Sequence, residues 1–182
     1  MNHPLASLPG RTRLFQALLV LTLLISIVMG IAGQPLNTPA APNGIVSFEL
    51  AGSVTKTQAI LDSWDSLARI HAGFIQGLDF LYLCIYSTTV GLGCLLASGI
   101  LKARRWPLAG VGNPLAWGLW LAALFDAVEN TALVISLFGP TQAPWPQIAW
   151  VCAVLKFGIL FIGLVYVFYG LAVRMVPVPQ PK

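Results

Sequence analysis

The sequence predicts an all-α membrane protein, a four-transmembrane-helix bundle with one sizeable outer loop. Hydrophobic residues make up 57% of the 182 residues and charged residues only 9%, whereas typical soluble chains carry about 25% charged residues. Such a chain has too little polar surface to cover a globule in water. The formal net charge of +4 is small and scattered, so a nucleic-acid partner is not expected.

Four apolar stretches carry this prediction. They cover residues 14–32, 74–101, 115–138 and 148–173. An α-helix needs about 20 residues to cross a hydrocarbon layer of about 30 Å, and each stretch is near or above that length. The stretches lack the alternation of a β-barrel, and an open sheet cannot hide its edge in lipid. Residues 1–182 are therefore expected to form a single membrane domain within the lipid bilayer.

The distribution of lysine and arginine predicts the orientation. Basic residues flank the predicted helices at both termini and in the second loop; they are Arg11, Arg13, Lys102, Arg104, Arg105, Arg174 and Lys182. Cytoplasmic loops of membrane proteins carry such an excess. We therefore expect the N- and C-termini in the cytoplasm and the loop at residues 33–73 outside.

The first apolar stretch also has a second interpretation. Its basic start, its apolar run and Gly30-Ile31-Ala32 resemble a secretory signal peptide with a cleavage site between small residues. The run is somewhat long for a signal peptide, so we favour a retained helix. The sequence alone leaves cleavage open.

The outer loop is expected to contain two short elements. Residues 34–43 are rich in proline and asparagine and should be irregular, whereas residues 45–50 alternate enough to predict a short strand. Thr55 and Gln58 then have the spacing of a capping box at the start of an amphipathic helix. The apolar face of that helix is expected to hold Ile60, Trp64 and Leu67. We favour a cap over the bundle; a lid over a ligand site is the alternative.

Charged residues at membrane depth carry the functional information. Asp126, Glu129 and Asn130 are three and four residues apart in the third predicted helix, so they share one face. A short loop joins the third and fourth helices into an antiparallel hairpin. Counted from that loop, Glu129 and Lys156 lie at similar depth, and we expect them to pair.

The second predicted helix adds a further carboxylate. Asp79 is expected close to the outer interface, and Tyr82 and Tyr86 continue its face inward. The predicted polar cluster, or ligand-binding site, therefore consists of Asp79, Tyr82, Tyr86, Asp126, Glu129, Asn130 and Lys156.

The charges in this predicted cluster do not balance. A charged side chain at the bilayer centre costs about 2.5–3.5 kcal/mol on insertion scales, so such groups pair or lose their charge. If Lys156 pairs with Glu129, Asp126 is left without a cation. We expect Asp126 to be protonated at neutral pH, or to share a proton with Glu129, unless a cationic ligand is bound. The alternative is that the polar groups only fix the register of the helices.

No recognised catalytic or cofactor-binding pattern accompanies the cluster. The three cysteines lie in apolar stretches without a CxxC pair, and the two histidines, His3 in the N-terminal tail and His71, are far apart. The sequence also lacks a Walker loop, GxSxG and HExxH. We therefore expect no metal site and no cofactor, and favour a protein without catalytic activity.

Several local patterns occur together in a familiar order. They are Phe48-Glu49-Leu50-Ala51-Gly52, Gln58 with Asp62-Ser63-Trp64, Asp79-Phe80, and Asp126-Ala127-Val128-Glu129-Asn130. Together with the hydropathy profile they resemble a group of small bacterial four-helix integral membrane proteins, mostly described as uncharacterised. The resemblance spans about residues 48–130. It implies a bacterial cytoplasmic (inner) membrane and an outer loop that belongs to the fold, but no activity.

Three functions are compatible with these features. The first is a non-enzymatic protein that binds a small amphipathic or cationic ligand, or a lipid, at the polar cluster. The second is an accessory or assembly subunit with a membrane-protein partner or a homo-oligomeric contact. The third is a proton-coupled carrier or intramembrane enzyme; because we see no internal repeat of the kind carriers show, it ranks last.

Overall fold

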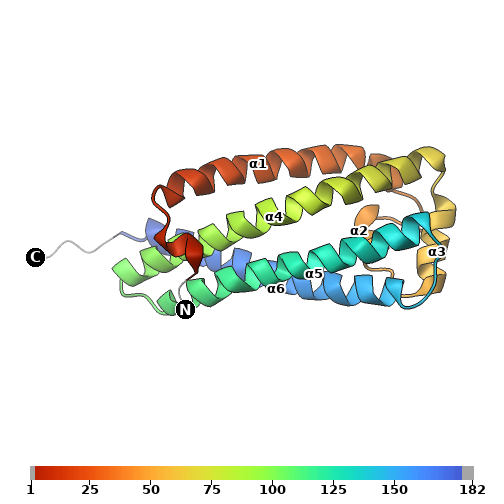
Figure 1. Ribbon diagram of the computed structural model, residues 1–182. Coiled ribbons are helices and arrows are strands. Elements are labelled where there is room, and N and C mark those ends of the chain that lie inside the picture. Colours follow the sequence, from red (N-terminus) through yellow and green to blue (C-terminus); the bar gives the residue numbers. More distant parts are fainter. Residues whose placement is uncertain (1–2, 178–182) are drawn as a thin grey trace, which may run out of the picture.

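The computed structural model describes residues 3–177, which form a bundle of long helices capped by short ones (Figure 1). The elements are η1 (Pro4–Ser7), α1 (Arg11–Ala32), η2 (Gln34–Leu36), α2 (Ile45–Glu49), α3 (Val54–Ser63), α4 (Ser66–Ala103), η3 (Ala109–Val111), α5 (Gly112–Phe138) and α6 (Trp145–Met175). Lys182, used above to predict the orientation, lies outside the described residues.

Within residues 3–177, four helices are long and apolar enough to cross a membrane. They are α1, α4, α5 (together with the preceding η3) and α6, and they correspond to the four apolar stretches of the sequence. The prediction of four membrane-length helices is therefore confirmed. Helix α4 begins at Ser66 rather than at residue 74, because the Asp65 carboxylate accepts a hydrogen bond from the backbone N–H of Ala68 at 2.8 Å and so caps a longer helix.

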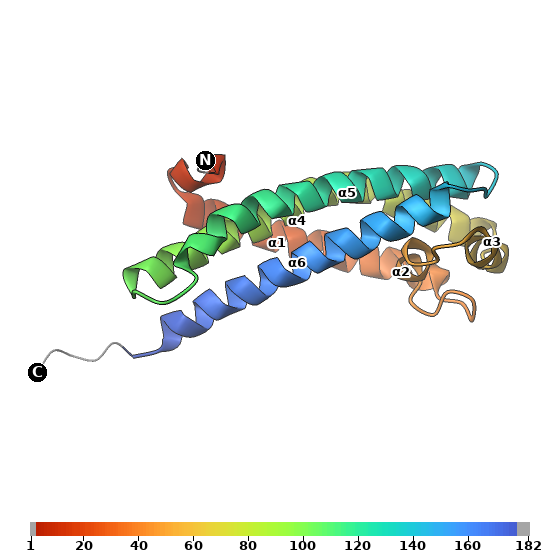
Figure 2. The same cartoon turned by 90° about the horizontal axis from the view of Figure 1, so that it is seen from below.

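Helices α4, α5 and α6 pack against one another, and α1 lies along α4 (Figures 1 and 2). Two hydrogen bonds between side chains join α1 to α4. Thr22 Oγ1 lies 3.0 Å from Thr89 Oγ1, and Ser26 Oγ lies 2.8 Å from the Tyr82 hydroxyl. The three mutually packed helices therefore form the core, and α1 is peripheral.

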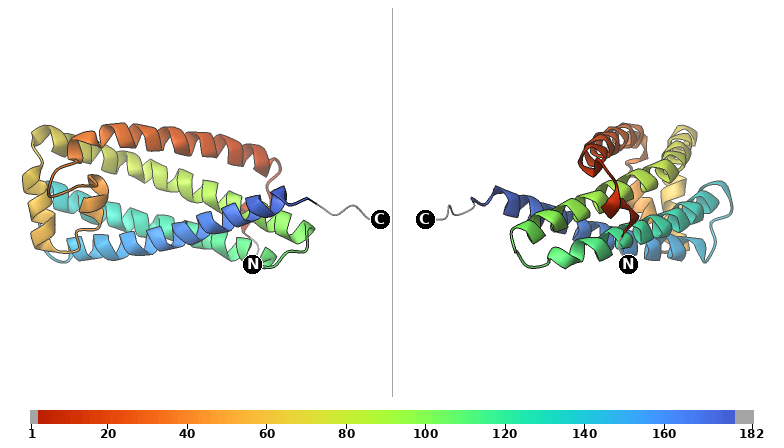
Figure 3. Two further views of the ribbon diagram at one scale, coloured as in Figure 1. Left: turned by 180° about the vertical axis from the view of Figure 1, so that it is seen from behind. Right: turned by 60° about the vertical axis from the view of Figure 1, so that its left-hand side comes forward.

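The two ends of the bundle differ (Figures 1 and 3). At one end, which we call the cap end, α2 and α3 lie across the ends of the long helices and a loop joins α5 to α6. At the opposite end, which we call the terminal end, lie η1, the loop from α4 to α5 and the C-terminal end of α6. The cap is therefore built from the segment between α1 and α4.

The predicted strand at residues 45–50 is wrong, because this segment forms helix α2. Among residues 3–177, β-pairing is limited to an isolated bridge between Thr38 and Ala41. A strand needs a partner for its backbone N–H and C=O groups, whereas a helical turn pairs them within the segment. Helix α2 is thereby able to bury Phe48 and Glu49 at the cap end.

The amphipathic helix of the loop is present but shorter than predicted. Its N-cap is Ser53, whose hydroxyl accepts a hydrogen bond from the Lys56 N–H at 3.3 Å, so the expected capping box at Thr55 does not form. The helix ends before Trp64, and Leu67 belongs to α4 and is exposed. The Trp64 indole N–H donates to the Leu36 carbonyl at 3.0 Å, which ties the C-terminal end of α3 to η2.

Small residues bring the core helices close together at the terminal end. A Cβ on Gly163 would lie 2.9 Å from Leu119 Cδ2, and a Cβ on Gly170 would meet the Cβ and backbone of Ala97. These contacts join α6 to α5 and to α4. Around them, the buried residues of this half are largely apolar: Val90, Cys94, Ala97, Leu101, Leu119, Tyr166 and Val173. Close helix packing through small residues is how membrane helices associate.

A first prediction concerns this packing. Gly170→Ala should lower the free energy of unfolding by about 1–3 kcal/mol, because the added methyl would meet backbone atoms of Ala97 that cannot move aside. The matched control is Gly158→Ala in the same helix, where an added Cβ has no neighbour within 4 Å. Thermal unfolding of both variants in a mild detergent measures the difference. Equal stability of the two would contradict the described packing of α6 on α4.

Candidate functional site

The long helices bring most of the predicted polar residues together. Asp79 and Tyr86 lie on α4, three residues on α5 and Lys156 on α6, and all are buried. Helix α2 adds a residue that the sequence analysis did not include, Glu49. We call this set the polar cluster; its members are Glu49, Asp79, Tyr86, Asp126, Glu129, Asn130 and Lys156.

Lys156 is the centre of the polar cluster. Its Nζ donates to Asp126 Oδ1 at 2.7 Å and lies 3.0 Å from the Glu129 carboxylate. The expected pairing with Glu129 is therefore present, but the expectation that Asp126 has no cation is wrong. The two carboxylates are three residues apart on α5, so they stand one turn apart on the same face. One ammonium group, with three N–H donors, reaches both.

Two further hydrogen bonds tie α4 to α5 at the polar cluster. The Tyr86 hydroxyl donates to Asp126 Oδ2 at 2.8 Å, and the Asn130 amide donates to Asp79 Oδ2 at 2.9 Å. Asp79 is buried among the long helices, and its expected position close to the outer membrane interface stays a prediction. Helix α4 begins at Ser66, so Asp79 lies roughly three and a half turns after the start of the helix.

Tyr82 lies at the border of the polar cluster. Its ring centroid is 5.3 Å from that of Tyr86, but its hydroxyl lies 2.8 Å from Ser26 Oγ on α1. Tyr82 thus links α4 to α1, and within residues 3–177 it makes no hydrogen bond to the carboxylates or to Lys156.

Glu49 is the functional candidate that the sequence analysis missed. Although it belongs to the loop segment, it is buried, and its Oε2 lies 3.8 Å from Lys156 Nζ. Burial raises the pKa of the Glu49 carboxyl to about 7, although the nearby Lys156 ammonium opposes this shift. One signal was available: Glu49 is the single charged residue between Arg13 and Lys56, and it stands between two large apolar residues.

The polar cluster contains more acids than bases. It buries four carboxyl groups, those of Glu49, Asp79, Asp126 and Glu129, with one ammonium group, and three of them lie within 4.0 Å of Lys156 Nζ. Each ion pair within residues 3–177 uses Lys156 as its cation. Asp79 accordingly has no Lys or Arg nitrogen within 4.0 Å among these residues. Over the same residues, no group of three or more His, Cys, Asp and Glu is placed to hold a metal ion.

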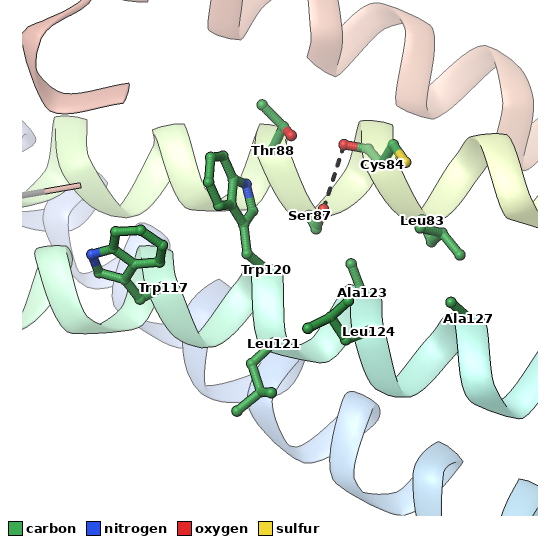
Figure 4. A pocket seen from close by; sticks show the side chains of 10 residues that line it. All are labelled: Leu83, Cys84, Ser87, Thr88, Trp117, Trp120, Leu121, Ala123, Leu124 and Ala127. Atoms are coloured by element: carbon green, nitrogen blue, oxygen red, sulfur yellow. Dashed lines mark hydrogen bonds between the residues drawn. The ribbon is translucent and has the colours of Figure 1, made fainter. Parts of the chain in front are cut away.

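A separate apolar groove of about 520 Å³ lies between α4 and α5 (Figure 4). Trp120 reaches from α5 towards α4. Trp117 lies near it on α5, at the same end of the groove. None of the seven residues predicted from the sequence lines it; the lining residues are Leu83, Cys84, Ser87, Thr88, Trp117, Trp120, Leu121, Ala123, Leu124 and Ala127.

The N-terminal segment covers the two tryptophans of this groove. The His3 ring centroid lies 4.7 Å from that of Trp117 and 4.3 Å from that of Trp120, and the ring is almost fully buried. The backbone N–H of His3 donates to Asn113 Oδ1 at 2.6 Å. His3 is therefore packed against α5 and is not part of a free tail as its position in the sequence suggested.

Comparisons with protein-family models, with curated proteins and with solved structures gave no match to this chain.

A second prediction concerns Lys156. Lys156→Met should destabilise the protein by about 3–5 kcal/mol, because it leaves buried carboxylates without their cation. Combining it with Asp126→Asn and Glu129→Gln should restore much of that loss, since the charges that need a partner are then removed as well. Thermal unfolding in detergent provides the measurement, with Lys56→Met on the exposed face of α3 as the matched control. A triple variant less stable than Lys156→Met would speak against charge pairing as the cause.

Proposed function

We propose that this chain is a non-enzymatic, multi-pass membrane protein whose polar cluster binds a small organic cation, such as the ammonium group of an amphipathic ligand. The resemblance described above supports a bacterial cytoplasmic membrane. The basic residues near the terminal end support cytoplasmic termini, which would place the cap end outside.

The observation that carries this proposal is the ratio of four buried carboxyl groups to one ammonium group. An ionised carboxylate in a low-dielectric environment requires a cation or a proton. Lys156 satisfies at most part of this requirement. A ligand that brings a second positive charge would relieve the remaining carboxylates and would therefore be held tightly.

The position of Asp79 supports a specific place for that second charge. Its Oδ2 accepts the Asn130 amide, and within the described residues no Lys or Arg nitrogen lies within 4.0 Å of it. Asp126, in turn, is held by both Lys156 and Tyr86. We place the ligand's cationic group beside Asp79, on the α4 side of the cluster. Lys156 would continue to hold Asp126 and Glu129.

A second candidate function, an accessory subunit of a membrane complex, is favoured by helix α1. Among the residues of α1 only Ile25 is buried within the chain, whereas 61% of the most apolar 18-residue window of α4 is buried. An apolar helix held on one side only can offer its other side to a partner helix or to lipid. Purification in mild detergent distinguishes the two candidates, because an assembly subunit would carry reproducible membrane-protein partners.

The cation-binding proposal is tested with a series of alkylammonium ions, from methylammonium to butylammonium. The purified protein in a neutral detergent should gain thermal stability with increasing ion concentration, because a ligand that binds the folded state stabilises it. Asp79→Asn should weaken the apparent affinity by about tenfold or more, as expected when one partner of a buried charge pair is lost.

Two controls accompany this experiment. Asp62→Asn makes the same substitution on the exposed face of α3 and should leave the stabilisation unchanged. Sodium chloride at equal concentration reproduces any effect of ionic strength alone. Equal stabilisation of the wild type and Asp79→Asn, or an equal effect of sodium chloride, would remove the proposed site.

A further inference from the structure

Buried polar atoms without a partner gather on the cap side of the polar cluster. Six side-chain N or O atoms in residues 3–177 are buried and have no hydrogen-bond partner within the protein. One belongs to His3 at the terminal end. The other five are Glu49 Oε2, Thr57 Oγ1, Gln76 Nε2, Glu129 Oε2 and Asn130 Oδ1. Of these, Glu129 Oε2 and Glu49 Oε2 lie 3.0 Å and 3.8 Å from Lys156 Nζ, so they have an ionic partner, whereas Thr57, Gln76 and Asn130 do not.

These five atoms extend from the polar cluster into the cap. Glu129 and Asn130 belong to the cluster itself, and Glu49 reaches it from α2. Gln76 stands one turn closer to the cap end than Asp79 on α4. Thr57 lies on the buried face of α3, the helix that closes this end of the bundle. The unpartnered groups therefore come from the cap helices as well as from the long helices.

Such atoms are the sites where proteins hold internal water or polar ligand groups. Leaving a buried polar group without a partner costs about 1–3 kcal/mol, and buried water molecules usually satisfy such groups. Four of the five residues carry no more than 1% of their possible exposure, and Glu49 carries 6%. Their side chains are thus enclosed by protein. A water molecule or a polar ligand group held between them would supply the missing hydrogen bonds.

The opposite side of the polar cluster has a different composition. Towards the terminal end, the buried residues between the core helices are the largely apolar set that surrounds Gly163 and Gly170. Here α6 is in close contact with α4 and α5 through glycine. An apolar, closely packed layer offers no hydrogen bonds to water or to an ion.

We propose that the cation-binding site is reached from the cap end only, along a hydrated path lined by Glu49 and Gln76. This inference rests on the proposed function, since it concerns the route to the same site. Glu49 is the carboxylate that an approaching cation meets on this route, and it selects cations over anions. The layer at the terminal end keeps the site closed on that side, so the chain binds its ligand from one side of the membrane.

The route is tested by thiol labelling of Gln76→Cys in a variant whose three native cysteines are replaced by alanine. The reagents are two membrane-impermeant methanethiosulfonates, one with a trimethylammonium group and one with a sulfonate group. They are added to intact cells and, separately, to inverted vesicles. Lys56→Cys on the exposed face of α3 serves as the reference, because its labelling shows which side of the membrane the cap end faces.

We expect Gln76→Cys to be labelled from the same side as Lys56→Cys and from that side only. The cationic reagent should react about tenfold or more faster than the anionic one, because acidic groups concentrate cations near them. Adding Glu49→Gln should reduce this preference severalfold. Leu119→Cys, in the apolar layer, should remain unlabelled from both sides. Thr57→Cys provides a second position if Gln76→Cys does not yield a monodisperse protein.

Labelling of Gln76→Cys from the opposite side would overturn the inference. So would a lack of labelling at both Gln76→Cys and Thr57→Cys in folded protein, or a charge preference that Glu49→Gln does not change. A result that contradicts the access route can be told apart from one that contradicts the cation-binding site itself. Alkylammonium ions would still stabilise the detergent-purified protein if the site exists but is reached in another way.

Discussion

The burial of one lysine among carboxylates is the constraint on which the other features of this fold depend. An ammonium group inside an apolar bundle is tolerated only when it is paired, and Lys156 pairs with Asp126 and Glu129 of the neighbouring helix. This pairing fixes the register of the α5–α6 hairpin. Through Tyr86, Asp126 extends the network to α4, and through Glu49 the network reaches the cap.

Hydropathy was sufficient to predict the four long helices, because an apolar stretch of membrane length admits few other structures. It was not sufficient for the short elements. The alternation at residues 45–50 is too brief to separate a strand from a helix of one or two turns, and the choice depends on whether a partner strand exists. The start of α4 was missed because Asp65 acts as its N-cap, whereas the predicted amphipathic helix was expected to continue to Leu67.

The site was predictable where it depends on helical spacing. Asp126, Glu129 and Asn130 share a face at any register, and the short hairpin loop places Lys156 at their depth. Counting residues gives depth to about one turn, so it could not show that Lys156 reaches two carboxylates rather than one. Glu49 was beyond this reasoning, because its position depends on how the loop folds back between helix ends. The direction of Tyr82 towards α1 likewise depends on packing.

The most direct test of the account is the distance between Lys156 and Asp126 in a lipid bilayer, measured by solid-state NMR on protein with ¹⁵N-labelled lysine and ¹³C-labelled aspartate. The sequence has four lysines and four aspartates, and Lys156→Arg and Asp126→Asn identify the two signals. We expect an ammonium nitrogen within about 4 Å of the carboxyl carbon, the separation of a charge-assisted hydrogen bond. A Lys156 signal without coupling to Asp126 would contradict the central ion pair.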